Sequence, residues 1–519
     1  MNASVIKRVA LPTKELSLLL DEIGIFETWK QIILTYAVNN FSKSKAEELF
    51  HSEEFKDVQL VQNDLLKDLA FGKISILYEF SLSYVNKDAR KKSGQYFTPD
   101  DVSKMLAEKS NSFDKGVWLD PCSGIGNLSY WLTKEQKNPE DFIKNNLILI
   151  DKDPLALLIA RSLFFLHFHE KENNLFENLK KNFIERDFLD DEVLPEYDYA
   201  ILNPPYVMVS ANPKFKTSQT RDLYAYFMEK IILSSKGFIS ITPQGFTNGD
   251  KFSSLRKLLI GNFNQLKIYC FDNVPDSIFK GIKFGSTNTN TTNSTRAAVT
   301  VAQKSNVKNY FITPLLRWRS ATRVQMLSNI DIYLTKTDLT EAIFPKNYKS
   351  LQEFYKTIKD EKWKSLLSFL SSKSTEFNLI IPSTPRYFIP SVKRSLLRSS
   401  FKTIYFKNES DLNLFYPLLN SSLLYWWWRV NDGGMTLSLS TLLSLPIPPK
   451  LQLNKELVAK IEKSEIDNLV VKLNAGKKNE NVKHSLILVD EINKTYFSEE
   501  IAKKLLKIHS NSDLEINEN

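Results

Sequence analysis

Short apolar runs alternate with helix-like stretches through the middle of the chain. Six runs stand out: "GVWLD", "NLILID", "YDYAILN", "GFISITP", "LKIYCF" and "RAAVTVA". Apolar runs of this length, bounded by turn residues, predict buried strands. Because helical patterns separate the runs, we expect an α/β domain built around a largely parallel sheet.

The pattern changes on both sides of this alternation, and it predicts four regions. Residues 1–90 show apolar positions at helical spacing, which indicates an N-terminal helical region. Residues 91–305 carry the strand–helix alternation. Residues 306–450 change character, being rich in Arg, Lys, Ser and aromatic residues, and we expect a separate domain there, of the α+β class. Residues 451–519 form a charged, helical tail with a polar end.

Composition narrows the class of protein. The 519 residues carry a formal net charge of +9, which suits a surface that binds a polyanion without requiring one. Two cysteines and no recognisable signal peptide or apolar span favour a protein of the reducing cytoplasm, with no membrane contact. His167 and His169 alternate but lack matching cysteines or carboxylates, so we expect no metal site.

A glycine-containing turn follows the first expected strand. Asp120 ends "GVWLD", and Gly124 and Gly126 in "PCSGIGN" allow a tight turn before a helix. Asp151 ends the next strand, where a carboxylate can bind ribose hydroxyls. The pattern also fits an ordinary nucleotide-binding sheet, although the missing third glycine disfavours NAD.

Two further segments extend this candidate site. In "FIERDF", Asp187 and Phe188 follow the third expected strand, where a carboxylate can accept from an adenine amino group and a ring can pack on the base. Upstream, Thr98 and Pro99 of "GQYFTP" begin an expected helix, whose first turn is acidic. Taken alone, this second segment is no more than a helix start.

The fourth expected strand ends in the tetrapeptide "NPPY". Pro204 and Pro205 cannot donate backbone hydrogen bonds, and each fixes its own φ. The result is a stiff turn at the carboxyl end of a strand, with Asn203 before the prolines and Tyr206 after them. On its own, this turn is equally typical of a simple strand end.

The ordered set "GQYFTP", "DPCSGIGN", "LIDKDP", "RDF" and "NPPY" resembles the gamma group of N6-adenine DNA methyltransferases, the Taq-methyltransferase-like enzymes. The resemblance implies a Rossmann-like class I fold and S-adenosylmethionine as cofactor. Cys122 stands where the family usually has a small residue. The implied cofactor contacts are Tyr96, Phe97, Thr98, Asp120, Cys122, Gly124, Asp151, Asp187 and Phe188.

The tetrapeptide suits the chemistry of adenine N6, whose lone pair is delocalised into the ring. Two acceptors, the Asn203 side-chain oxygen and the Pro204 carbonyl, can draw that lone pair out of the plane. The target base must leave the duplex, and Tyr206 would stack on it. By position, Phe279 in "DSIFKGIKF" resembles the family's second base-contacting aromatic, with Phe284 behind it; a core phenylalanine is the alternative.

The region 306–450 is the expected target recognition domain for double-stranded DNA. Its densest basic part is "TPRYFIPSVKRSLLRSSFKTIYFKN", although a solvated face with core aromatics would look similar. We expect the Trp426–Trp428 run to pack in a core. The candidate DNA contacts are Arg386, Lys393, Arg394 and Arg398.

Three alternatives remain open at this point. The same tetrapeptide serves enzymes that methylate RNA adenines or a protein glutamine, and the chain could be a non-catalytic DNA-binding subunit. "GQYFTP" and the large basic region favour DNA, as in the modification enzyme of a restriction-modification system. No nuclease pattern is evident, so a restriction endonuclease would be a separate partner, or the companion would be absent and the chain an orphan methyltransferase. The sequence indicates neither the recognition site nor the oligomeric state.

Overall fold

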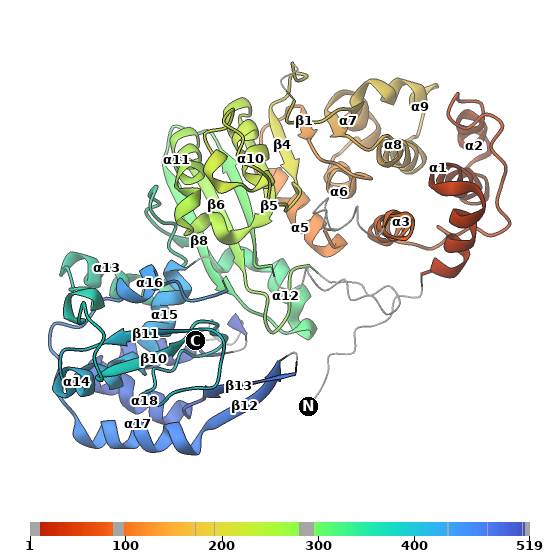
Figure 1. Cartoon of the computed structure of the whole chain (residues 1–519). Helices are drawn as coiled ribbons and strands as arrows, with labels where there is room; N and C mark the ends of the chain where they lie inside the picture. Colours follow the sequence, from red (N-terminus) through yellow and green to blue (C-terminus); the bar gives the residue numbers. More distant parts are fainter. Residues whose placement is uncertain are drawn as a thin grey trace.

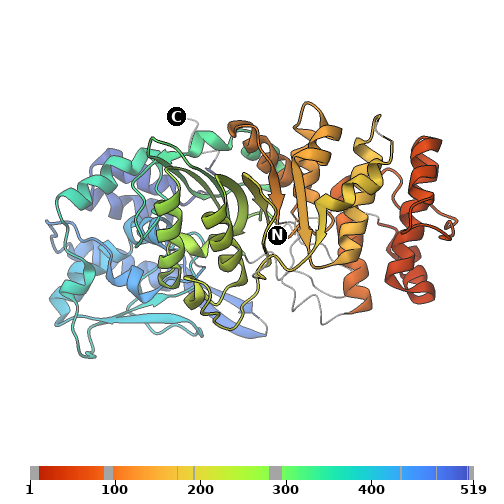
Figure 2. The same cartoon turned by 90° about the horizontal axis from the view of Figure 1, so that it is seen from above.

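The protein has two lobes, of which the larger holds the central sheet and the N-terminal helices (Figure 1). Seen from above, the N-terminal helices lie at one end and the C-terminal half at the other, with the sheet between them (Figure 2). The computed structural model describes residues 11–86, 98–171, 173–190, 193–279, 295–432, 435–474, 476–510 and 512–513.

Nine strands of the described chain form one sheet in the order β3-β2-β1-β4-β5-β7-β6-β8-β9. Strands β1 to β5 pair in parallel, and β7 lies antiparallel between β5 and β6. This order confirms the expected Rossmann-like α/β fold. The strands are β1 (Trp118–Asp120), β2 (Leu147–Asp151), β3 (Phe183–Glu185), β4 (Tyr199–Leu202), β5 (Gly237–Pro243), β6 (Gln265–Phe271), β7 (Ala297–Gln303), β8 (Asn309–Leu316) and β9 (Thr335–Lys336).

Helices cover both faces of this sheet, because successive strand residues point to opposite sides. In β4, Tyr199 and Ile201 join the core shared with α1, α3, α5, α6 and α8, whereas Ala200 and Leu202 join the core shared with α10 and α11. The larger lobe's helices are α1 (Thr13–Asn40), α2 (Lys43–Phe50), α3 (Phe71–Val85), α5 (Asp100–Lys109), α6 (Asn127–Lys134), α7 (Pro139–Asn145), α8 (Pro154–Phe168), α9 (Leu175–Asn178), α10 (Leu223–Ser234), α11 (Ser253–Asn262) and α12 (Arg323–Ser328).

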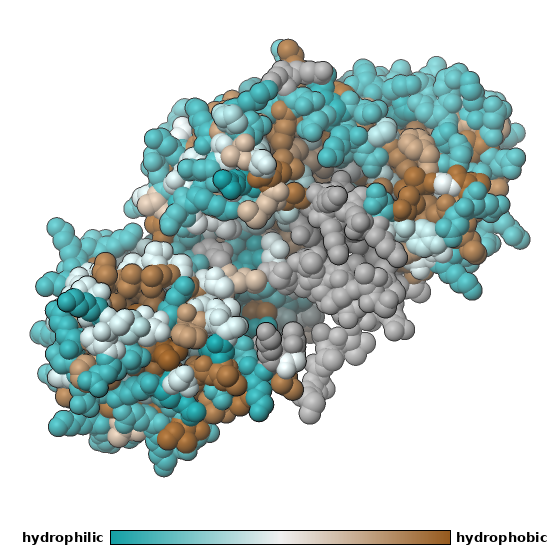
Figure 3. All heavy atoms as spheres, viewed as in Figure 1, coloured by the Kyte–Doolittle hydropathy of each residue, from teal (hydrophilic) through white to brown (hydrophobic). Residues whose placement is uncertain are grey.

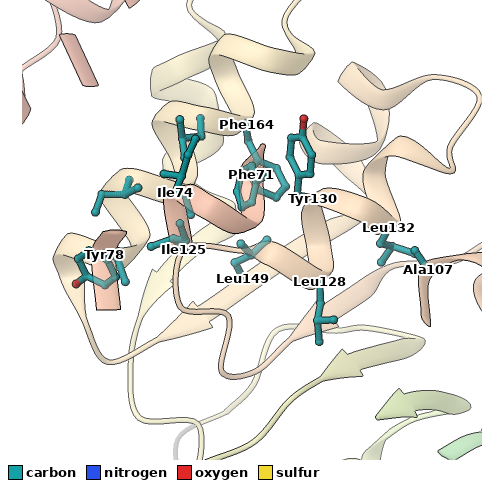
Figure 4. Close-up of a cluster of buried hydrophobic side chains, with 14 of the residues drawn as sticks. Phe71, Ile74, Tyr78, Ala107, Ile125, Leu128, Tyr130, Leu132, Leu149 and Phe164 are labelled. Carbon is teal, nitrogen blue, oxygen red and sulfur yellow. The ribbon is translucent and has the colours of Figure 1, made fainter. Parts of the chain in front are cut away.

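The N-terminal helices share a core with the sheet. Phe71 at the start of α3 stacks on Tyr130 of α6 with 4.0 Å between ring centroids, and it lies edge-on to Phe164 of α8. Figure 4 shows these rings together, with Ile74 and Tyr78 of the same helix nearby. Helix α3 therefore packs against the two helices that follow β1 and β2.

The smaller lobe has a core of its own, made of residues from Tyr348 to Ile508. Trp426 and Trp428 are fully buried in it, which confirms their expected packing role. Two antiparallel strand pairs, β10–β11 and β12–β13, accompany its helices. The elements are α13 (Gln352–Asp360), β10 (Asn378–Pro382), β11 (Phe401–Tyr405), α14 (Glu409–Leu419), α15 (Ser422–Asn431), α16 (Leu439–Leu443), α17 (Lys455–Asp467), β12 (Leu469–Asn474), β13 (Lys477–Val482), α18 (Leu486–Tyr496) and α19 (Glu499–Lys507).

The structure moves two of the expected region boundaries. The boundary at residue 305 falls inside the sheet, since β8 pairs in parallel with β6 and β9 pairs with β8. The boundary at residue 450 falls inside the smaller lobe's core, because Leu457, Ile461 and Leu505 pack with residues before it. The expected tail also contains the β12–β13 hairpin, which its charged composition did not indicate.

The outer surface seen in Figure 3 is mostly hydrophilic, with apolar patches over both lobes. Within the described ranges, every helix is too short or too polar to cross a bilayer.

Candidate active site

A cavity of about 310 Å³ lies at the carboxyl edge of β1, β2 and β4. Carboxyl ends of parallel strands meet at one edge of a sheet, so motifs far apart in sequence converge there. Nine of the residues predicted from the sequence line this cavity: Thr98, Asp120, Cys122, Gly124, Asp151, Asp187, Phe188, Asn203 and Pro205.

The glycine turn forms one wall of the cavity. Gly124 and Gly126 have φ of 51° and 85°, a left-handed conformation that favours glycine. A Cβ at Gly126 would approach the Phe164 ring to 2.9 Å, whereas one at Gly124 would meet nothing within 4 Å. Gly126 thus lets the turn pack on α8, and Gly124 borders open space. The Gly124 N–H also donates a 2.7 Å hydrogen bond to Asp151 Oδ2.

Two buried carboxyl groups stand beside this turn. Asp120 is 2% exposed, and Ser129 donates a 2.8 Å hydrogen bond to its Oδ2 atom. Burial raises the pKa of Asp120 to about 7. Burial also raises the pKa of Asp151, while hydrogen bonds from the backbone N–H groups of Gly124 and Asp153 oppose the shift. The two groups are close enough for the charge of Asp151 to raise the pKa of Asp120 further.

Asp187 and Phe188 follow β3 and reach the cavity in different ways. Asp187 is exposed, and its Oδ1 atom accepts a 2.9 Å hydrogen bond from the Leu189 N–H. Phe188 is buried and stacks on Phe227 of α10 with 5.4 Å between centroids. A rigid apolar ring next to an exposed carboxylate is an arrangement that can hold a purine by its face and its amino group.

Asn203 comes directly after β4, and a short chain of hydrogen bonds fixes its side chain. Its Nδ2 atom donates a 2.9 Å hydrogen bond to the Thr98 hydroxyl. Asn127, the first residue of α6, donates a 2.7 Å hydrogen bond to the Thr98 carbonyl and another to Ser103 Oγ. Thr98 is only 4% exposed. The segment before α5 therefore links the glycine turn to the tetrapeptide.

The last residues of the tetrapeptide lie next to the cavity lining. Tyr206 donates a 3.0 Å hydrogen bond from its hydroxyl to the Ile241 carbonyl at β5, which orients its ring. The Phe279 ring lies edge-on to it, with 6.0 Å between centroids and 66° between planes. Phe279 is 2% exposed and belongs to the core, so its position is compatible with both roles expected for it. Pro204, within the same tetrapeptide, is buried.

Helix α3 contributes cavity residues that the sequence did not identify: Ser75, Tyr78, Glu79 and Leu82. The Tyr78 hydroxyl donates a 2.5 Å hydrogen bond to Asp153 Oδ2, and Asp153 caps helix α8. The only signal in the sequence was the apolar spacing of a helix. That spacing indicates a buried face but does not indicate what the face meets.

The four candidate DNA contacts fall into two pairs. Lys393 is bound to Glu462 at 2.5 Å and to Asn413 at 2.6 Å. Arg398 donates to the Ser400 and Glu480 carbonyls and to the Thr384 hydroxyl. Arg386 and Arg394 have exposed side chains. Lys393 and Arg398 therefore have a structural role within the smaller lobe, whereas Arg386 and Arg394 face solvent.

Three expected contacts, Tyr96, Phe97 and Phe284, lie outside the described residues. Within the described ranges, no three His, Cys, Asp or Glu side chains are grouped so that they could hold a metal ion.

Comparisons with known proteins agree with the motifs. Residues 145–279 match the Eco57I restriction-modification methylase family. The type II methyltransferase M.PstI of Providencia stuartii is 26% identical over 227 residues, which cover 40% of this chain and 44% of that protein. M.BsuBI of Bacillus subtilis is 28% identical over 218 residues, which cover 38% of this chain and 43% of that protein. The resemblance to restriction-modification DNA methyltransferases is confirmed, and the chain matches less than half the length of these curated relatives.

Among solved structures, the type IIG restriction endonuclease BpuSI is similar with a TM-score of 0.41 and 12% identity, over 97% of this chain and 78% of that one.

Proposed function

We propose that this protein transfers a methyl group from S-adenosylmethionine to the N6 atom of an adenine in double-stranded DNA. The observation that carries the proposal is the Asn203 amide at the cavity's edge, held by the Thr98 hydroxyl at 2.9 Å. In this function the chain would be the modification enzyme of a restriction-modification system, acting in the cytoplasm of a prokaryotic cell.

The proposed chemistry depends on how the amide is held. Its nitrogen donates to Thr98, so the oxygen lies at the other end of the same planar group. Together with the Pro204 carbonyl, this oxygen can accept the two hydrogens of an exocyclic amino group. Such acceptors pull the nitrogen lone pair out of the ring, and they cost no reorganisation because they are already fixed. No general base is needed before attack, since the amine loses its proton readily once it is methylated.

The cavity suits the proposed cofactor. S-adenosylmethionine supplies an electrophilic methyl group on a sulfonium sulfur when it is bound. Asp151 would bind the ribose hydroxyls, and Asp187 would accept from the adenine amino group while Phe188 packs on the base. The open space at Gly124, where a Cβ would meet nothing within 4 Å, fits a ligand that lies against the turn. The main task of these residues is to align the methyl group with the target nitrogen.

Tyr206 and Phe279 are the proposed contacts of the target base. A base that leaves the duplex loses stacking, and an aromatic side chain can restore roughly 1–3 kcal/mol of it. The bond from Tyr206 to the Ile241 carbonyl keeps the ring in place before the base arrives. Arg386 and Arg394, with exposed side chains in the smaller lobe, are the proposed phosphate contacts. A separate restriction endonuclease is a proposed partner of this modification enzyme.

Transfer of tritium from labelled cofactor to duplex DNA, RNA or protein separates the possible substrates. We expect label in duplex DNA as N6-methyladenine, and long-read sequencing of DNA from an expressing host would give the sequence context. Label only in RNA or protein would refute the proposal. Cofactor binding without transfer to any of the three would favour a non-catalytic subunit.

Replacing Asn203 tests the role of the amide directly. We expect Asn203→Ala to abolish methyl transfer while cofactor affinity stays close to that of the wild type. Asn264→Ala is a matched control, because Asn264 is an exposed asparagine at the amino end of β6, on the opposite edge of the sheet. Activity above about a tenth of the wild-type rate, a loss of less than about 1.4 kcal/mol, would show that the amide is not the activating group.

A further inference from the structure

Arg323, the first residue of α12, joins two segments that meet at the candidate active site. It lies outside every motif in the sequence and is 2% exposed. Its guanidinium donates to Asp101 Oδ2 at 2.5 Å and to Asp101 Oδ1 at 3.1 Å. It also donates to the Ser277 carbonyl at 2.8 Å and to the Ile278 carbonyl at 2.7 Å. One side chain thus makes four hydrogen bonds to two separate segments.

The first segment is the start of helix α5. Asp101 lies in its first turn, three positions after Thr98. Thr98 in turn accepts the hydrogen bond from the Asn203 amide. A shift of the first turn of α5 would therefore be transmitted to the Asn203 side chain through a single residue.

The second segment is residues 272–279, which lead from β6 to Phe279. Its beginning is fixed because buried Asp272 accepts hydrogen bonds from Arg296 at 3.0 Å and from Arg317 and Arg429 at 2.9 Å each. Its end is fixed by Arg323, on the two carbonyls that directly precede Phe279. Phe279 then lies against Tyr206.

We propose that Arg323 is a positioning residue, which sets the place of the Asn203 amide relative to the Tyr206–Phe279 ring pair. This inference rests on the proposed function, in which the amide and the rings hold the same base. The amide is placed from one side of the guanidinium, through Asp101, α5 and Thr98. The rings are placed from the other side, through the Ser277 and Ile278 carbonyls.

The geometry requires arginine at this position. A guanidinium has five N–H donors in a rigid plane, so it can serve a carboxylate and two carbonyls at once. A lysine keeps the charge but has three donors on one nitrogen and cannot span the same set of acceptors. Asp101 keeps 33% of its side chain exposed, so water can solvate its carboxylate when the guanidinium is removed.

The test compares Arg323→Met and Arg323→Lys with Lys109→Met. Lys109 is a matched control, since it lies on α5, the helix that carries Asp101, and its 2.8 Å ion pair joins α5 to Asp331, shortly after α12, rather than to residues 272–279. The full chain is used throughout. Three quantities are measured: cofactor affinity by calorimetry, the single-turnover rate of methyl transfer to duplex DNA, and the emission of 2-aminopurine placed at the target position found by sequencing.

We expect both Arg323 variants to transfer methyl about 10- to 100-fold more slowly, as small misplacements of reacting groups do, with cofactor affinity within about twofold of wild type. The 2-aminopurine signal should change in the same variants. Lys109→Met should leave the rate and the emission close to wild type.

Rates within about twofold of wild type for Arg323→Lys would overturn the inference, even if Arg323→Met fails to fold. So would an equal loss in Lys109→Met, or a loss explained entirely by weaker cofactor binding. If the wild-type protein transfers no methyl group to DNA, the proposed function fails and this inference fails with it. If the wild-type protein methylates DNA and the Arg323 variants do so at the same rate, this inference fails but the proposed function stands.

Discussion

Asn203 and Thr98 are joined by a 2.9 Å hydrogen bond across 105 positions of the chain. The bond connects the carboxyl end of β4 to the segment that begins α5. The bond fixes the orientation of the Asn203 amide, with the nitrogen toward Thr98 and the oxygen away from it, and the proposed chemistry depends on that orientation. Thr98 was expected from the sequence to contact the cofactor. The structure gives it this second contact, which the motif alone did not indicate.

Thr98→Val tests the importance of this bond. Valine has nearly the same shape but lacks the hydroxyl, so the Asn203 amide loses the acceptor that orients it. We expect the rate of methyl transfer at saturating substrates to fall about 10-fold, because the oxygen is no longer held toward the amino group.

Thr133→Val is the control for Thr98→Val, since Thr133 is also fully buried but its hydroxyl bonds within helix α6. A rate for Thr98→Val that matches the control would mean that the backbone of the tetrapeptide orients the amide without help from Thr98.

The converging residues of the site could be predicted because each sits at the end of a strand. Asp120 and Asp151 end β1 and β2, and Asn203 directly follows β4; these strands pair in parallel, so their carboxyl ends share one edge. Recognising the strands and expecting a largely parallel sheet was therefore enough to place the three side chains together. The glycine turn could also be predicted, because a left-handed φ like that at Gly124 and Gly126 favours glycine.

The contributions from outside the motifs could not be predicted, because they depend on pairings between distant segments. Lys393 stood out in a basic run, yet its ammonium group is bound to Glu462 of α17. Tyr78 stood in an apolar helix, yet its hydroxyl reaches Asp153 at the cavity. Neither pairing leaves a periodic trace in the sequence. The same holds for β8, whose place in the catalytic sheet is set by its pairing with β6.

Asp151→Asn tests the proposed ribose contact. In the wild type, the Asp151 carboxylate accepts hydrogen bonds from the Gly124 and Asp153 N–H groups. The asparagine amide would direct its own NH₂ group at one of these donors, so that hydrogen bond would be lost. We expect cofactor affinity to fall about 10- to 100-fold, the range for losing a hydrogen bond to a charged group. Calorimetry with S-adenosylmethionine measures it.

Asp198→Asn serves as the control for Asp151→Asn, because Asp198 precedes β4 at its other end and pairs with Lys236 at 2.7 Å. Unchanged cofactor affinity in Asp151→Asn would place the ribose elsewhere in the cavity.

The basic residues of the smaller lobe should separate into two groups by experiment. We expect the double variant Arg386→Ala with Arg394→Ala to bind duplex DNA more weakly while its thermal midpoint stays unchanged. If both residues contact phosphates, the plot of log affinity against log salt concentration should become less steep. The magnitude of its slope should fall by about 2, roughly one for each lost contact.

Lys393→Ala with Arg398→Ala is the matched pair from the same segment. Both side chains hold parts of the smaller lobe together, so this variant should lower the thermal midpoint. A steep loss of DNA affinity in this pair, with normal stability, would reverse the assignment of the two groups.

Asp120 should make the unfolding free energy depend on pH. Burial raises its pKa in the folded protein to about 7, above the ordinary value of 3.8. Between these two values the folded state holds a proton that the unfolded state has released. The contribution of Asp120 to the unfolding free energy therefore decreases as the pH rises from about 4 to 7, by up to about 1.4 kcal/mol per pH unit, and levels off above that range.

Asp120→Asn removes the titrating carboxyl group without changing the size of the side chain, so its proton no longer contributes to the unfolding free energy. The raised pKa of Asp151 contributes to both proteins, so the difference between them reports the titration of Asp120 together with its charge interaction with Asp151. Without cofactor, the stability of the variant relative to wild type should increase steadily from pH 4 to 7, as followed by denaturant unfolding. Asp114→Asn, the same substitution at an exposed position, is measured alongside as the control. A constant difference for Asp120→Asn would mean that the carboxyl group is already ionised in the folded protein at low pH.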